Sequence, residues 1–135
     1  MKLSSPLLGS ALLAACLGAL GRAQPAQGPL VRMAELEIDP SELDQYRAAV
    51  AEEIETSIRM EPGVLAIYAV SVKDSPSHLR FFEIYADEAA YKGHLDSAHF
   101  KRYVDVTRPM ILSRKLLETT PVVLGSKAKG LPGCI

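Results

Sequence analysis

The segment VLAIYAVSVKD, residues 64–74, restricts the possible folds of this chain more than any other stretch. It is apolar on both alternating faces, one formed by Val64, Ala66, Tyr68 and Val70 and the other by Leu65, Ile67 and Ala69. A strand with two apolar faces needs protein packed against each of them. We therefore expect this strand inside a sheet that is covered on both sides.

The neighbouring segments predict the elements around this strand. Side-chain periodicity and turn residues indicate strands at 30–38, 64–74, 79–87 and 113–125, and helices at 39–60, 88–95 and 98–106. The turn SPSH, residues 75–78, can join its two neighbouring strands as a hairpin. Asp87 and Ser97 are suited to cap the two short helices. This order predicts a ferredoxin-like α+β fold, with an antiparallel sheet and helices on one face.

The first helix should pack one side against the sheet, and the tripeptide EPG at 61–63 ends it. Apolar residues recur along it at helical spacing and form one stripe, made of Leu43, Tyr46, Val50, Ile54 and Ile58. Glu52, Glu53 and Arg59 fall outside this stripe.

The predicted helices are too few to cover both faces of the sheet. The face that carries Leu65, Ile67 and Ala69 would stay open in a single chain. A second copy of the same sheet would cover it and produce a two-fold symmetric dimer. The strand pattern therefore predicts a homodimer.

The N-terminus has the layout of an export signal. Residues 1–23 combine an early lysine, an apolar run and small residues near the end, which predicts a signal peptide. LAAC, ending at Cys16, resembles a bacterial lipobox and offers lipidation as the alternative. Both routes predict a periplasmic or secreted protein, and the apolar run is too short for a membrane span. The remaining chain divides into a linker at 24–29, a domain at 30–121 and a C-terminal tail at 122–135.

Charge and cysteine content exclude two further classes. The formal net charge is −1, so no basic excess indicates nucleic acid binding. Removal of the signal peptide would also remove Cys16. Cys134 would then be the single remaining cysteine, which excludes an internal disulfide framework.

Two segments resemble the antibiotic biosynthesis monooxygenase (ABM) domain, and most of all its small quinol monooxygenases. They are MEPGVLAIYAV, residues 60–70, and LRFFEIYADEAAYKGHLDSAHFKRY, residues 79–103. The resemblance implies a dimeric α+β barrel that oxidises quinols or phenols with O₂, without metal or flavin. Haem-degrading relatives use an Asn on the first strand and a Trp on the second helix, and this sequence has neither.

His94 and His99 are the candidate catalytic residues. Metal ligands on one helix are usually three or four residues apart, whereas this pair is five apart across a helix break, so we expect no metal. Histidine has an ordinary pKa of about 6.5 and can remove a proton from a phenol. Either histidine could instead have only a structural role.

Five residues are candidate substrate contacts. Phe81, Glu83 and Tyr85 share one face of the third strand, and Tyr68 and Tyr103 come from the second strand and the last helix. They could line an apolar pocket between the sheet and the helices, with Arg80 and Arg108 as further candidates for holding an anionic oxygen. Buried tyrosines of the ordinary core would give the same pattern.

These features favour an exported, homodimeric, cofactor-independent monooxygenase that acts with O₂ on a quinol or another small phenolic compound. An exported protein has no ready supply of nicotinamide or flavin, which agrees with cofactor-free chemistry. The alternative is a dimeric α/β barrel, ligand-binding or stress-associated, that has no catalytic activity.

Overall fold

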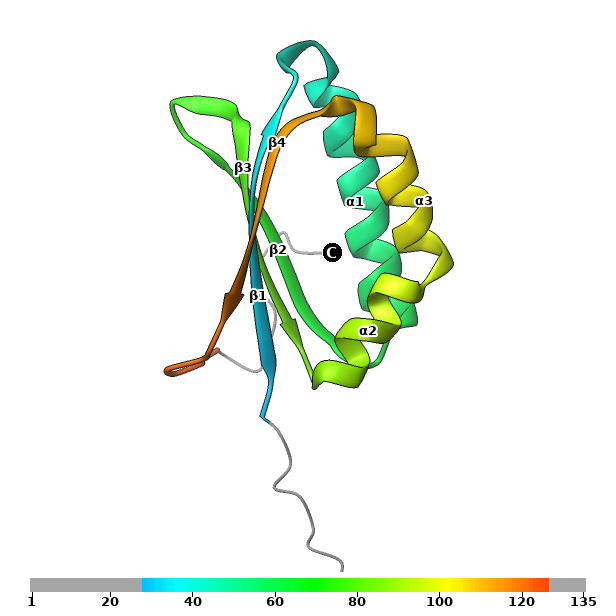
Figure 1. The fold of residues 1–135 in the computed structure, drawn as a ribbon, viewed down its shortest axis with the longest axis vertical. Helices are drawn as coiled ribbons and strands as arrows, with labels where there is room; N and C mark the ends of the chain where they lie inside the picture. Colours follow the sequence, from blue (N-terminus) through cyan, green and yellow to red (C-terminus); the bar gives the residue numbers. More distant parts are fainter. Residues whose placement is uncertain (1–27, 127–135) are drawn as a thin grey trace, which may run out of the picture.

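The computed structural model describes residues 28–126. Four strands, β1 (Leu30–Ile38), β2 (Val64–Val72), β3 (Ser75–Tyr85) and β4 (Ile111–Thr119), form an antiparallel sheet in the order β2-β3-β1-β4. Three helices, α1 (Leu43–Met60), α2 (Glu88–Asp96) and α3 (Ala98–Thr107), lie together on one face of this sheet (Figure 1). Two 3-10 helices, η1 (Pro40–Glu42) and η2 (Arg108–Met110), precede α1 and β4. The predicted ferredoxin-like α+β fold is confirmed.

Several predictions concern residues outside the described range. They are the signal peptide at 1–23, lipidation at Cys16, most of the linker at 24–29, and the end of the tail that holds Cys134. Export therefore stays a prediction. Within the described residues, no helix is long and apolar enough to cross a membrane.

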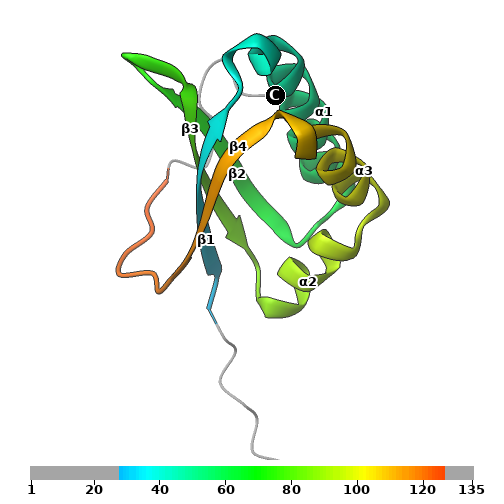
Figure 2. The same cartoon turned by 45° about the horizontal axis from the view of Figure 1, so that its top comes forward.

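Side-chain caps begin both short helices, as predicted. Oδ1 of Asp87 accepts a hydrogen bond from the backbone N–H of Ala90 at 2.8 Å, and Oγ of Ser97 accepts one from Phe100 at 3.2 Å. Ser97 is the single residue between α2 and α3, and its extended backbone changes the direction of the chain. As a result α3 runs beside α1, which Figure 2 shows from a second direction.

The hairpin between β2 and β3 is tighter than predicted. Residues 75–78 belong to β3, and residues 73–74 alone make the turn. A two-residue loop is sufficient for an antiparallel hairpin. Pro76 is tolerated because β1 pairs with β3 only from His78 onward, so no β1 carbonyl lacks a donor there. Strand β4 also differs from its predicted range, since it covers 111–119.

A bulge near the start of β2 changes which residues face the helices. The pairing register with β3 shifts between Val64 and Ala66. As a consequence Val64 and Ile67, three residues apart, are both buried in the core, with Ala69 packed beside them. The prediction that Ile67 and Ala69 lie on the uncovered face is therefore wrong. The prediction that both faces of this strand are apolar is confirmed.

We call the sheet surface opposite the helices the open face. Directly paired residues of neighbouring strands lie on the same side of a sheet, so the pairing registers place on the open face Met33, Ala66, Tyr68, Val70, Phe82, Ile84 and Leu117. Tyr68 and Val70 are 43% and 58% exposed. No helix or strand of residues 28–126 covers this face (Figure 1).

The buried stripe of α1 continues through polar residues. Tyr46 and Val50 are buried, as predicted, but Ile58 is 43% exposed. Glu53 and Ser57 take its place in the interior, at helical spacing from Val50. Their burial is compensated because Oγ of Ser57 donates to Oε1 of Glu53 at 2.7 Å. The prediction that Glu53 lies outside the stripe is wrong.

Candidate active site

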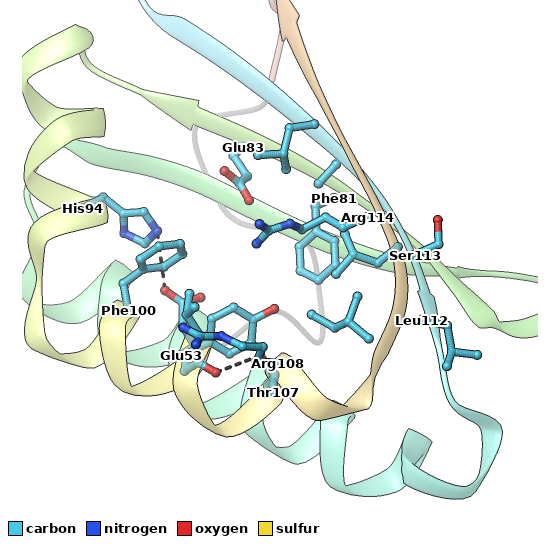
Figure 3. Close-up of a pocket in the computed structure, with 16 residues that line it drawn as sticks. Glu53, Phe81, Glu83, His94, Phe100, Thr107, Arg108, Leu112, Ser113 and Arg114 are labelled. Atoms are coloured by element: carbon cyan, nitrogen blue, oxygen red, sulfur yellow. Dashed lines mark hydrogen bonds and ion pairs between the residues drawn. The ribbon is translucent and has the colours of Figure 1, made fainter.

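A cavity of about 420 Å³ lies between the sheet and the helices α2 and α3, beside the edge strand β4. Its walls are mainly apolar, and its polar lining includes Glu53, Glu83, His94, Tyr103, Arg108 and Arg114. Figure 3 shows His94 projecting from the helical side and Glu83 from the sheet. Apolar walls with a few converging polar groups are typical of small-molecule sites.

His94 occupies a buried position on α2 at the edge of this cavity. The residue is 2% exposed, and its ring packs against Tyr85 and Phe100 at centroid distances of 5.4 and 4.6 Å. Tyr91, one helical turn earlier, also packs on Tyr85 at 5.1 Å. The spacing of Tyr91 and His94 places both on the side of α2 that faces the sheet.

One oxygen of Glu61 contacts both histidines. Its Oε1 lies 2.9 Å from Nδ1 of His94 and 2.7 Å from Nε2 of His99. An ionised carboxylate only accepts hydrogen bonds, so both ring nitrogens are donors, and the tautomers follow from this network. Neutral His94 therefore keeps Nε2 as an acceptor, on the side of Glu53, whose Oε1 is 3.7 Å away.

His99 lies behind this cavity and does not border it. It lines a second groove of about 350 Å³ between α1 and α3, together with Glu53 and Arg102. Its Nε2 is also 3.2 Å from Oγ of Ser57. The two candidate bases thus have different environments, and only His94 borders the larger cavity between the sheet and the helices.

Glu83 enters the cavity from β3, beside Phe81, as the alternation of the strand predicted. The Tyr85 hydroxyl donates to its Oε2 at 2.8 Å. Burial raises the pKa of Glu83, although the Tyr85 hydrogen bond and the nearby His94 act in the opposite direction. Burial and the adjacent Glu83 carboxyl raise the pKa of Tyr85, which keeps its hydroxyl protonated. Tyr85 therefore supports Glu83 and does not line the cavity itself.

Tyr103 borders the cavity from α3. Its hydroxyl lies 2.7 Å from the hydroxyl of Tyr46 on α1. Burial is the main cause that raises the pKa of both tyrosines, so one neutral hydroxyl donates to the other. This hydrogen bond joins the two helices beside the cavity.

Two residues considered for the pocket lie on the opposite side of the sheet. Tyr68 is paired with Phe82 on the open face. Arg80 also points to the open face, where it lies 3.9 Å from Glu35. The prediction that Tyr68 lines this cavity is wrong, because the β2 bulge reverses the face on which it lies. Arg108 does border the cavity.

Glu53, Glu61 and Arg114 are not among the site residues that the sequence predicts. The sequence indicates for Glu61 only that the first helix ends there. Arg114 is paired with Leu36 on the helical side of the sheet and so faces the cavity from β4. Glu53 was recognisable in principle, because it continues the helical spacing of the buried residues of α1.

Glu53, His94 and His99 bring three metal-ligand groups together. One ligand-type atom from each residue lies within 4.8 Å of the other two. Ligand spacing along one helix does not describe this group, because α1, α2 and α3 each contribute one residue. The expectation that no metal is bound is not tested by this arrangement and stays a prediction.

Comparison with known proteins identifies similar chains. A family model described as antibiotic biosynthesis monooxygenase matches residues 29–106. A candidate antibiotic biosynthesis monooxygenase of Bacteroides thetaiotaomicron is 47% identical with a TM-score of 0.72, over 78% of this chain and 100% of that one. A candidate monooxygenase of Lactobacillus acidophilus is 30% identical with a TM-score of 0.65, over 67% of this chain and 44% of that one.

A more distant likeness concerns the fold alone. A candidate antibiotic biosynthesis monooxygenase of Nitrosomonas europaea is 21% identical with a TM-score of 0.67, over 71% of this chain and 93% of that one. A comparison with curated proteins gave no match. The range matched by the family model contains Glu61, Glu83, His94 and His99.

Proposed function

The chain belongs to the antibiotic biosynthesis monooxygenase family, and from this premise we propose that it uses O₂ to oxidise a quinol or another small phenolic compound without an added cofactor. One observation carries the proposal. The buried imidazole of His94 is oriented by Glu61 and borders a mainly apolar cavity. This is the arrangement that a general base for a phenolic hydroxyl requires.

In this proposal His94 removes the proton from the substrate hydroxyl. Glu61 holds the Nδ1 proton, so Nε2 is free to accept the substrate's proton, and the carboxylate then stabilises the imidazolium. The surrounding Tyr85 and Phe100 rings keep water away from His94. Attraction between opposite charges is stronger in such surroundings than in bulk water.

The anion of an electron-rich quinol can then pass an electron to O₂ directly. For phenol itself, C₆H₆O + O₂ gives C₆H₄O₂ + H₂O, so one oxygen atom enters the ring and the other leaves as water. The substrate supplies all four electrons, and no external reductant is required. The cavity of about 420 Å³ lies within the usual range for small-molecule sites, about 300–1,000 Å³.

Glu83 is the candidate acid for the second half of this reaction. Its raised pKa leaves a larger protonated fraction than an exposed glutamate has at the same pH. A protonated carboxyl can donate to the oxygen that is being reduced. The hydrogen bond from Tyr85 keeps Glu83 directed into the cavity. Acid and base would then face one ring from the sheet and from the helices.

Oxygen consumption tests the proposal. The purified protein is incubated with a panel of hydroquinones and phenols, and O₂ uptake is compared among the parent protein, His94→Gln and the control His78→Gln. His78 lies on β3 with its side chain 41% exposed. We expect uptake above autoxidation, a loss of about 100-fold or more in His94→Gln, and no loss in His78→Gln. Equal uptake in His94→Gln would overturn the base role, and phenol binding without uptake would support the non-catalytic alternative.

We also propose that two copies pair through the open face to form the dimeric barrel. Tyr68 and Val70 expose apolar surface there, next to the half-buried Phe82 and Ile84. Removal of such a continuous apolar surface from water favours association. The open faces of two copies are identical, as a two-fold interface requires.

A further inference from the structure

We propose that Glu53, His94 and His99 form a binding site for one divalent transition-metal ion of the Zn²⁺ type, and that occupancy of this site prevents His94 from acting as a base. The second clause rests on the proposed function, whereas the site itself does not. One carboxylate and two imidazoles are a common ligand set for such ions.

The three ligands already lie close to coordinating positions. Their ligand atoms are within 4.8 Å of one another, and Nε2 of His94 is 3.7 Å from Oε1 of Glu53. Zinc bonds of about 2.0–2.2 Å to nitrogen and oxygen place neighbouring ligands about 3.3 Å apart in a tetrahedral site. Small side-chain rotations are therefore sufficient to close the triad. Each ligand comes from a different helix, which holds the three in place without an ion.

Supporting hydrogen bonds for the ligands are also present. Metal-bound histidines usually donate their other ring N–H to a carboxylate, and metal-bound carboxylates are themselves hydrogen-bonded. Here Nδ1 of His94 lies 2.9 Å from Glu61, so Nε2 is directed toward the ion. Ser57 donates to Glu53 at 2.7 Å. His99 would exchange its present contact with Glu61 for the metal.

An ion can reach this site without crossing the larger cavity. Glu53 and His99 both line the groove between α1 and α3. Glu53 and His94 are 8% and 2% exposed, so a bound ion would be well shielded from solvent. Imidazole ligands favour Zn²⁺, Co²⁺ and Fe²⁺ over Mg²⁺ and Ca²⁺, which prefer oxygen. We therefore expect selectivity for transition metals.

A metal ion bound at this site would block catalysis, because it would occupy the same nitrogen atom that accepts the proton. Nε2 of His94 is the proposed proton acceptor, and it is also the ring nitrogen near Glu53. A nitrogen that donates its lone pair to a metal cannot accept a proton. Micromolar Zn²⁺ should therefore inhibit O₂ uptake, and the Zn²⁺ concentration that gives half inhibition should equal the Kd of the site.

Isothermal titration of Zn²⁺ and the visible spectrum of Co²⁺ test the site. The chain is used after chelator treatment, with Cys16→Ser and Cys134→Ser in every arm so that thiols do not bind the ion. We expect one ion per chain and a four- or five-coordinate Co²⁺ spectrum. Glu53→Gln and His99→Gln should each weaken binding at least tenfold, whereas the controls Glu55→Gln and His78→Gln should not. Glu55 is exposed and does not line the groove, and the His78 side chain is 41% exposed.

The possible outcomes separate the two proposals. No saturable binding, or equal binding in folded Glu53→Gln and the parent, would overturn the metal site and leave the base role unaffected. Binding without inhibition would overturn the link to His94. If Fe²⁺ or Zn²⁺ raised O₂ uptake, the metal site would be supported and the cofactor-free function overturned. Circular dichroism and thermal unfolding establish that each variant is folded.

Discussion

Nδ1 of His94 lies 2.9 Å from Oε1 of Glu61, although the two residues are 33 positions apart in the sequence. Glu61 ends α1, and His94 lies in the last turn of α2. Their contact determines which nitrogen of His94 carries the proton and which one faces the cavity. The proposed base role of His94 and the proposed metal site both depend on this contact.

Glu61→Gln should lower O₂ uptake by about 100-fold or more, within the range of general acid–base effects. The amide can donate to Nδ1 of His94, which favours the tautomer with its proton on Nε2. Steady-state rates over a pH series would measure the loss. Glu55→Gln, an exposed change on the same helix, is the control. An unchanged rate in Glu61→Gln would contradict the orienting role.

Glu83→Gln should alter the pH dependence of stability. The pKa of Glu83 is raised above 4.5 in the folded protein, so ionisation costs more in the folded state than in the unfolded state. The favourable contribution of its neutral form is complete below about pH 4.5 and is lost as pH rises through the folded pKa. The free energy of unfolding of Glu83→Gln should therefore increase relative to the parent as pH rises from about 4.5.

Urea unfolding at a series of pH values measures this difference. Glu118→Gln, which changes an exposed glutamate on β4, is the matched control. A difference for Glu83→Gln that stays constant with pH would show that burial does not affect this carboxyl.

Gly63→Ala should destabilise the fold by about 1–3 kcal/mol, as overpacking of a core does. An added Cβ at Gly63 would lie 2.5 Å from Cβ of Ala90, where β2 begins beside α2. Thermal unfolding measures the loss. Gly93→Ala, where an added Cβ meets nothing within 4 Å, should instead stabilise α2 by up to about 1 kcal/mol.

A double-mutant cycle identifies the cause of the Gly63 effect. Ala90→Gly removes the atom with which the new Cβ collides, so its combination with Gly63→Ala should cost less than the sum of the two single changes. Strict additivity would indicate that the destabilisation does not come from this contact.

Tyr68→Asp should convert the proposed dimer to a monomer. Tyr68 is 43% exposed on the open face and is paired with the apolar Phe82, so a carboxylate buried there in the interface would lose its hydration. Light scattering coupled to gel filtration at micromolar concentration measures the mass. Ile58→Asp places the same charge on an exposed position of α1 and should stay dimeric. A monomeric parent protein would refute the proposed pairing.

Local chemistry explains which parts of the fold were predictable. Asp87 and Ser97 cap helices through contacts with residues three positions away, so their role can be recognised in a short segment. The alternation of Phe81, Glu83 and Tyr85 likewise follows from strand geometry. Prediction failed at Tyr68, because a single bulge in β2 exchanges the faces of the residues after it.

The order of elements, the two-sided strand and the family resemblance can be recognised in the sequence, because each depends on spacing along a few neighbouring residues. Tertiary packing decided the site. Glu53, Glu61, His94 and His99 come together only because α3 turns at Ser97 and runs beside α1. The five-residue interval between His94 and His99 indicates that the two histidines are not metal ligands on one helix. The same interval, folded across a turn, directs both rings toward one carboxylate oxygen.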